Sequence, residues 1–107
     1  MKRGEVWWVN FDQSVGGGIQ KRRPAVIVSN DAANKYLHRL QVVPLTSNIE
    51  RIYPSEACIT LDKKKAKAMT DQLVTVSTQR LTKRIGVLSS KDMNNIGEAI
   101  KIQLDLS

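Results

Sequence analysis

The residue best suited to chemistry is Arg23, which lies in the stretch QKRRPAVIVSND at residues 20–31. Arg23 precedes Pro24, and a residue before proline is driven out of the α region into extended backbone. The apolar residues that follow predict a buried strand, so Arg23 should stand at its start. A guanidinium fixed there has a permanent charge and forked donors, which suit it to binding phosphate.

A second group of polar side chains follows another predicted strand. Residues 40–46 read LQVVPLT, and the hydroxyls of Thr46 and Ser47 come at the end of this run. Both hydroxyls can donate a hydrogen bond to a phosphate oxygen. Arg23 and Thr46 can act together only if the fold brings the two strand ends to the same place.

If the substrate is RNA, the internal 2′-hydroxyl is available as the nucleophile. The chain contains one histidine, His38, which excludes a mechanism based on two histidines. The ten acidic residues are scattered without a paired motif, so we expect no catalytic metal and no cofactor. What remains is electrostatic stabilisation by a fixed arginine, and this leaves the general base unassigned.

Length and composition indicate one basic domain covering residues 1–107. Seventeen Lys and Arg against ten Asp and Glu give a net charge of +7. This balance favours a polyanionic partner, nucleic acid first, although a merely basic soluble protein is the alternative. A single cysteine, Cys58, excludes an intrachain disulfide and fits a reducing cytoplasm. We expect no membrane span and no secretory signal.

The hydrophobic pattern predicts many short strands followed by one amphipathic helix. Strands are expected at 5–11, 25–28, 40–46, 56–61, 72–76 and 84–88, a short helix at 32–37, and a charged turn or short helix at 63–67. A final helix should run from Ser89 or Ser90 to about Leu106. The predicted fold class is mainly β with helices (α+β), a small antiparallel barrel whose open end or edge the helix closes.

Two elements carry apolar patterns that predict what they bury. In the first strand, Trp7, Val9 and Phe11 share one face, and Val6 and Trp8 share the other. Apolar bulk on both faces predicts a barrel wall that is also covered on its outside, for example by a partner subunit. In the final helix the predicted buried stripe consists of Met93, Ile96, Ile100 and Leu104.

Four blocks of the sequence resemble the MazF/PemK/Kid toxins of bacterial toxin–antitoxin pairs. They are RGEVWWV at 3–9, RPAVIVSND at 23–31, VVPLTS at 42–47 and a weaker TQRL at 78–81. They follow one another in the family's order over essentially the whole chain. The resemblance implies an SH3-like barrel, a homodimer, and a metal-independent, sequence-specific endoribonuclease (mRNA interferase) that acts on single-stranded RNA. It also implies products with a cyclic phosphate and a 5′-hydroxyl, inhibition of translation and growth, and neutralisation by a cognate antitoxin with an acidic tail.

The resemblance also assigns roles to individual residues. It implies that Arg23 is the catalytic arginine, that Thr46 is its catalytic partner and that Gln79 lines the RNA site. We further predict RNA binding by four polar residues at the two strand ends, namely Lys21, Arg22, Ser47 and Asn48.

Departures from the family pattern leave two alternatives open. Gly18 stands where many members have an acid, Gly17 where some have a histidine, and Thr78 where some have an aspartate before the glutamine. One alternative is therefore a catalytically weakened MazF-like protein. The other is a non-catalytic, CcdB-like toxin that binds gyrase with the same barrel, although the RP and PLTS blocks favour the nuclease.

Overall fold

The computed structural model describes residues 1–11 and 21–107. The predictions that concern Gly17 and Gly18 lie outside these residues. The elements, in chain order, are β1 (Glu5–Asn10), β2 (Arg22–Ile27), α1 (Asp31–Tyr36), β3 (Arg39–Thr46), β4 (Glu56–Leu61), β5 (Lys64–Met69), the 3-10 helix η1 (Thr70–Gln72), β6 (Val74–Ser77), the 3-10 helix η2 (Thr78–Arg80), β7 (Leu81–Val87) and α2 (Ser90–Gln103).

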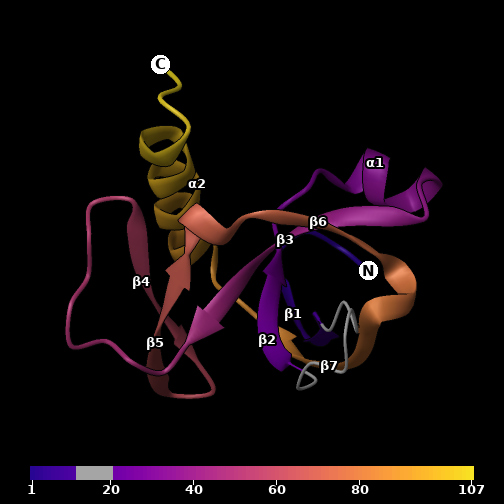
Figure 1. The fold of residues 1–107 in the computed structure, drawn as a ribbon, viewed down its shortest axis with the longest axis horizontal. Coiled ribbons are helices and arrows are strands. Elements are labelled where there is room, and N and C mark those ends of the chain that lie inside the picture. Colours follow the sequence, from indigo (N-terminus) through magenta and orange to yellow (C-terminus); the bar gives the residue numbers. More distant parts are fainter. Residues whose placement is uncertain (12–20) are drawn as a thin grey trace, which may run out of the picture.

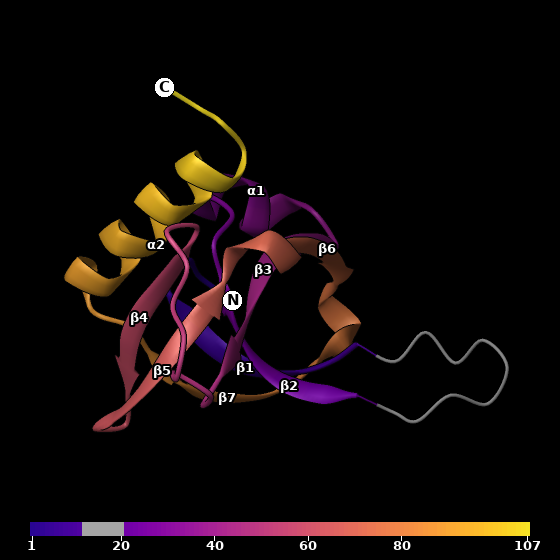
Figure 2. The same cartoon turned by 60° about the vertical axis from the view of Figure 1, so that its left-hand side comes forward.

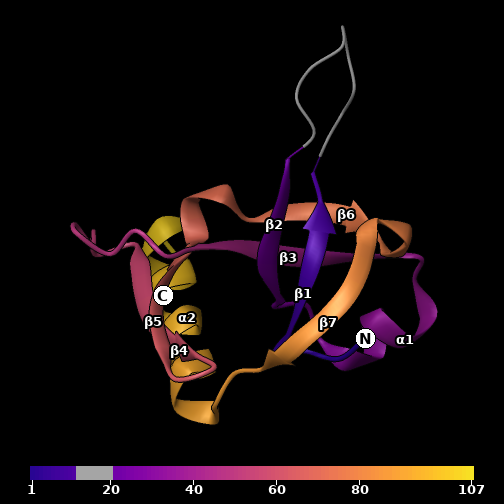
Figure 3. The same cartoon turned by 90° about the horizontal axis from the view of Figure 1, so that it is seen from below.

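The strands form one strongly curled antiparallel sheet. Its order is β4-β5-β3-β2-β1-β7, and β6 pairs with β3 outside this path. Figure 1 shows β4, β5 and α2 on one side and the curl of β1, β2, β6 and β7 on the other. Seen from below, β6 and β7 bend around the end of β1 and β2 (Figure 3). The predicted barrel with a C-terminal helix is confirmed. Within the described ranges, no helix is both long and apolar enough to cross a membrane.

The central strands β1, β2 and β3 bury side chains on both faces. Alternate residues along them enter two separate apolar clusters, because successive side chains of a strand point in opposite directions. The first cluster includes Val6, Val26, Val28, Val43 and Leu45, and it is completed by β4, β5 and α2. The second includes Val9, Ala25, Ile27, Leu40 and Val42, and Trp7 and Phe11 pack against it. The Val6 face is thus covered within the same chain, so its burial does not require a partner subunit.

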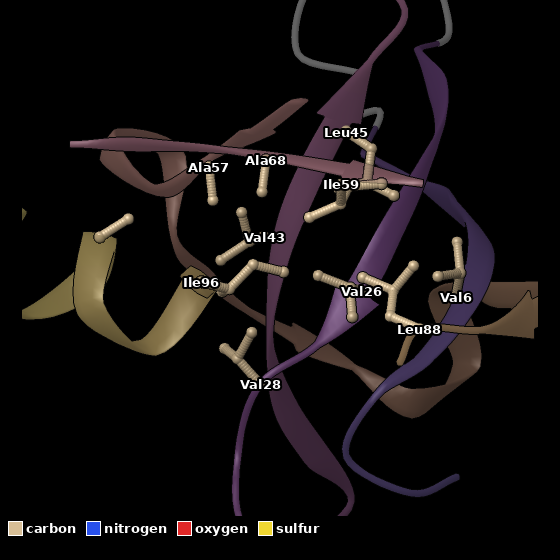
Figure 4. Packing of buried hydrophobic residues seen from close by; sticks show 11 residues of the cluster. Val6, Val26, Val28, Val43, Leu45, Ala57, Ile59, Ala68, Leu88 and Ile96 are labelled. Carbon is tan, nitrogen blue, oxygen red and sulfur yellow. The ribbon is translucent and has the colours of Figure 1, made fainter. Parts of the chain in front are cut away.

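Helix α2 closes the first cluster. Its N-cap is Ser89, whose Oγ accepts a hydrogen bond from the Asp92 backbone N–H at 3.1 Å. Ile96 is completely buried against the sheet (Figure 4), with Met93 and Ile100 partly buried beside it. Leu104 is 50% exposed, so the predicted stripe was wrong at its last position, because the helix ends at Gln103. Figure 2 shows α2 lying along β4.

The charged turn or short helix predicted at 63–67 was wrong. Residues 64–69 form β5, which pairs with β4 from Glu56↔Met69 to Leu61↔Lys64. Only Asp62 and Lys63 make the turn, both with positive φ (51° and 65°), as a two-residue hairpin of the tightest kind requires. The lysines concealed a strand because lysine is uncommon in strands. Lys64 and Lys65 are exposed, whereas the Lys67 side chain is only 13% exposed.

The later strands also begin at different residues from those predicted. The expected strand 72–76 starts only at Val74, after η1, and the expected strand 84–88 starts already at Leu81. Backbone pairing explains both differences, because Val74 pairs with Val42 and Leu81 pairs with Val9. These partners come from distant parts of the chain, so local pattern carried no sign of them.

Pro24 ends the pairing between β2 and β3. The Val28 N–H donates to the Gln41 carbonyl at 3.0 Å, and the register then runs through Val26↔Val43 to Ala25↔Pro44. Hydrogen-bonded and non-hydrogen-bonded pairs alternate along such a ladder. Pro24 and Leu45 would form the next hydrogen-bonded pair, but proline has no N–H to donate. No pair follows Ala25↔Pro44, so β2 and β3 part at this point, while Leu45 pairs with Ala68 of β5 on the other edge of β3.

The Glu5 carboxylate links β1 to its neighbours. Its Oε1 accepts a hydrogen bond from Trp7 Nε1 at 2.9 Å, and its Oε2 lies 3.8 Å from Arg84 Nε of β7. Burial raises the pKa of Glu5, but the bonds from Trp7 and from the Lys2 backbone lower it, as do the charges of the N-terminal amine and Arg84. The net result is a pKa below the usual value of a glutamate.

We expect Glu5→Gln to lower the free energy of unfolding at neutral pH but not in acid. Because the folded-state pKa is depressed, the carboxylate contributes stability above its unfolded pKa and loses it as the pH falls through the folded pKa. Urea denaturation of both proteins at about pH 7 and about pH 2 spans the ordinary range of a glutamate. A difference of equal size at both pH values would contradict this assignment.

Candidate active site

A small cavity lies where β2 begins. It has a volume of about 230 Å³ and is lined by Phe11, Lys21, Arg23, Pro44, Gln72 and Val74. These residues come from the ends of β1 and β2, from β3, from η1 and from β6. Two cations, one amide and three apolar groups therefore meet in one place, although they are widely separated in the sequence. This composition suits an anionic group attached to an apolar ring.

Arg23 is held by β2 but remains exposed to solvent. Its backbone pairs with Val9 of β1, and the preceding Lys21 carbonyl accepts a hydrogen bond from Phe11 N–H at 2.8 Å. Within residues 1–11 and 21–107, no carboxylate forms an ion pair with Arg23. Its charge is thus available to a ligand in the cavity. Lys21 and Arg23 line the same cavity.

Thr46 and Ser47 line a neighbouring cavity of about 350 Å³. Its walls include Trp8, Pro24, Leu45, Leu61 and Ile85. Arg23 and Pro44 line the first cavity, and the residue that follows each of them, Pro24 and Leu45, lines the second. In a continued ladder Arg23 and Thr46 would be direct partners, two positions beyond Ala25↔Pro44. The pairing between β2 and β3 ends before that position, so Arg23 and Thr46 belong to strand ends that have parted.

Local hydrogen bonds orient the groups that follow β3. Thr46 Oγ1 accepts a bond from Asn48 N–H at 3.2 Å, which leaves the hydroxyl proton to be donated. Asn48 Oδ1 in turn accepts from Glu50 N–H at 3.2 Å. The Asn48 side chain is thus engaged with its own loop, and Ser47 beside it is exposed.

Arg22 does not join Arg23. Its guanidinium stacks on the indole of Trp8, 5.0 Å from the ring centre, on the side of the second cavity. Adjacent residues of a strand point to opposite faces, which separates the two arginines. Arg22 therefore lies beside Trp8, which lines the cavity that contains Thr46, and it does not line the cavity that contains Arg23.

Gln79 lies in η2 and lines neither cavity. It is exposed, and its backbone N–H is used by the Ser77 cap at 3.2 Å. Gln72 is the glutamine that lies in the Arg23 cavity, and the sequence interpretation missed it. A signal was present, since Asp71 directly precedes Gln72, which is the Asp–Gln order that the resemblance associates with the RNA site.

No three His, Cys, Asp or Glu side chains of the described residues gather closely enough to hold a metal ion. His38 and Cys58 are both exposed and lie in neither cavity. The two cavities are lined by one guanidinium, several ammonium groups, an amide, hydroxyls and the carboxylate of Asp62. The cationic and hydrogen-bond-donating groups among them can stabilise charge developing on a phosphate without becoming part of a covalent intermediate.

Comparison with known proteins identifies the family of this chain. The family model described as "PemK-like, MazF-like toxin of type II toxin-antitoxin system" matches residues 2–104. The chain is 38% identical to endoribonuclease MazF9 of Mycobacterium tuberculosis over 115 aligned positions, covering 99% of this chain and 98% of the relative. It is 27% identical to endoribonuclease EndoA of Bacillus subtilis, with 99% and 96% covered.

Solved structures show the same fold. A mycobacterial endoribonuclease in complex with its cognate antitoxin superposes with a TM-score of 0.83 at 25% identity, covering all of this chain and 97% of the other. The MazF of Deinococcus radiodurans gives 0.80 at 21% identity, with 98% and 96% covered. The resemblance carried by the four sequence blocks is confirmed, and the chain belongs to the PemK-like, MazF-like toxin family of type II toxin–antitoxin systems.

Proposed function

We propose that this protein is an endoribonuclease toxin that cleaves single-stranded RNA in a sequence-specific manner and so blocks translation and growth. The observation that carries the proposal is that β2 and β3 part beyond Ala25↔Pro44, where Arg23, which forms no ion pair with the described residues, and Thr46 come at the two strand ends. Endoribonuclease is also the name of the relatives that match nearly the full chain. The net charge of +7 favours a polyanionic substrate.

In the proposed reaction the RNA supplies its own nucleophile. The 2′-oxygen forms a bond to the adjacent phosphorus, the bond from phosphorus to the 5′-oxygen breaks, and the products are a 2′,3′-cyclic phosphate and a 5′-hydroxyl. One proton leaves the 2′-oxygen and one is added to the 5′-oxygen. Arg23 stabilises the negative charge that accumulates on the phosphorane. Thr46 donates to a phosphate oxygen, and Lys21 and Gln72 hold the strand in the first cavity.

We further propose that a cognate antitoxin with an acidic segment silences the enzyme, and that the toxin acts as a homodimer. A structurally similar endoribonuclease was solved with its cognate antitoxin. An acidic segment would compete with RNA for the same cations. Exposed apolar side chains on β7, Ile85 and Val87, lie outside both clusters and suit a subunit contact.

We expect purified protein to cleave a long RNA in the presence of chelator and to leave 5′-hydroxyl ends. A single 2′-deoxy substitution at the mapped site should abolish cleavage there, because the nucleophile is removed. The matched control carries the 2′-deoxy substitution one nucleotide away, and it should be cut at nearly the normal rate. A strict requirement for Mg²⁺, or cleavage at the deoxy site, would contradict the mechanism. Growth arrest without any RNA cleavage would instead favour a gyrase-binding or catalytically inactive toxin.

A further inference from the structure

The segment 47–55 joins β3 to β4 and begins directly after Thr46. It contains no helix or strand, and most of its side chains are exposed. Ser47 and Asn48 belong to it, and Arg51 and Tyr53 extend it along the surface. Irregular loops beside a rigid sheet commonly carry recognition residues. Such a loop can select particular bases only if hydrogen bonds or packing hold its backbone in one conformation.

Lys67 of β5 fixes the middle of this segment. Its Nζ donates to the Arg51 carbonyl at 2.8 Å and to Glu56 Oε1 at 3.2 Å. The same Glu56 oxygen accepts the Tyr53 backbone N–H at 3.0 Å. The side chains of Lys67 and Glu56 are only 13% and 9% exposed. One ion pair therefore holds two backbone positions of the segment at once.

The end of the segment is attached separately. Thr70 is buried, and its Oγ1 donates to the Ser55 carbonyl. The Glu56 backbone N–H donates to the Tyr53 carbonyl at 2.8 Å. These bonds do not involve Lys67, so loss of the lysine should release residues around 51–53 without detaching β4. The contacts of Lys67 can therefore be removed by one substitution while Thr70 still holds the end of the segment.

The ion pair lies next to the candidate active site. Lys67 is the direct partner of Thr46 in the β3–β5 ladder, and direct partners project to the same face of a sheet. The Lys67 side chain runs from the level of the Thr46 hydroxyl to the Arg51 carbonyl. The other lysines of this hairpin, Lys63, Lys64 and Lys65, are exposed.

We propose that Lys67 and Glu56 form a positioning pair that determines which RNA sequences are cleaved; this rests on the proposed endoribonuclease function. Sequence in unpaired RNA is read by hydrogen bonds and stacking on the base edges and faces, and Asn48, Arg51 and Tyr53 are the exposed groups of the segment that offer both. Arg23 and Thr46 remain fixed by their strands. Loss of the pair should therefore alter the choice of site more than the rate of phosphoryl transfer.

The test is Lys67→Met, which keeps an unbranched side chain but removes the ammonium. The ratio of cleavage at the preferred site to cleavage at the next site on one long RNA should fall by about tenfold or more, because a small displacement of a positioning group has effects of this size. The matched control is Lys101→Met, which breaks an exposed ion pair with Glu98 on α2. The control should change the ratio by less than about twofold.

Two further variants separate positioning from overall stability. Lys67→Arg keeps donors for both acceptors and should retain the cleavage ratio. Glu56→Gln keeps an oxygen for the Tyr53 N–H but loses the charge facing Lys67, so its ratio should fall in the same direction. Amide hydrogen exchange in residues 47–55 should become faster in Lys67→Met and remain unchanged in Lys101→Met.

Several results would overturn the proposal. A Lys67→Met protein with a lower melting temperature but an unchanged cleavage ratio would show a structural role only. Equal weakening of binding to all RNAs, with a salt dependence reduced by about one ion, would place Lys67 on a phosphate instead. If the wild-type protein cuts no RNA, the proposed function fails. Hydrogen exchange then still decides whether the pair holds the segment.

Discussion

Replacing Arg23 with alanine is expected to lower the single-turnover rate of RNA cleavage by about 10²–10³-fold, the usual effect of removing one preorganised charge from a transition state. The fold should be retained, because the Arg23 side chain is exposed and forms no ion pair with the described residues. Rapid-quench cleavage of a short RNA at saturating enzyme measures the chemical step, and circular dichroism checks the fold.

The matched control is Arg39→Ala, at the opposite end of β3. Arg39 is also exposed and carries the same charge, but its backbone pairs with Ser77, away from both cavities. It should leave the rate within about twofold, because salt largely screens the interaction between this distant charge and the phosphate. Arg23→Lys adds a second comparison, because it keeps the charge but loses the fork that can hold two phosphate oxygens. A wild-type rate in Arg23→Ala would remove Arg23 from the mechanism.

Replacing Ile96 with alanine is expected to lower the free energy of unfolding by about 2–5 kcal/mol, the usual cost of an Ile→Ala cavity in a packed core. Ile96 has no exposed surface and lies among residues of β2, β3 and β4 (Figure 4). This loss is large beside the total of about 5–15 kcal/mol that small domains possess. Urea denaturation followed by tryptophan fluorescence measures it.

Ile102→Ala on the same helix provides the control. Ile102 is 58% exposed, so the same deletion of atoms opens no internal cavity. Its effect should stay within about 0.5 kcal/mol. Similar losses for the two substitutions would mean that α2 is stabilised by helix propensity and not by its contact with the sheet.

Much of the fold could be predicted from local pattern. Pro24 correctly placed Arg23 at the start of a strand, and the alternation in residues 56–61 gave β4 its exact bounds. The alternating faces of the first strand were also correct, since Val6 and Val9 enter different clusters. The strand at Lys64–Met69 was missed because three of its six residues are lysines, which are uncommon in strands, and because the turn before it has Lys63 where glycine is more common.

The site was less accessible to sequence reasoning than the fold. Arg23 and Lys21 are neighbours in the chain, so their shared cavity required no knowledge of tertiary structure. Gln72 enters the same cavity from η1, nearly fifty residues away, because β6 pairs with β3. The roles assigned to Arg23, Thr46 and Gln79 stay predictions, and Gln79 lines neither cavity. Lys67 is one of four lysines in residues 63–67, and the sequence does not distinguish it from the exposed ones; its two acceptors do.

The missing backbone N–H of Pro24 affects how a ligand reaches the site. The nitrogen of Pro24 carries no hydrogen and cannot donate to Leu45. No backbone hydrogen bond between these two residues therefore has to be broken before a polyanion binds. Separating two paired strands would otherwise weaken binding by the free energy of the backbone hydrogen bond that is lost. Because this opening is specified by covalent chemistry, heat or salt that leaves the barrel folded leaves the entrance open as well.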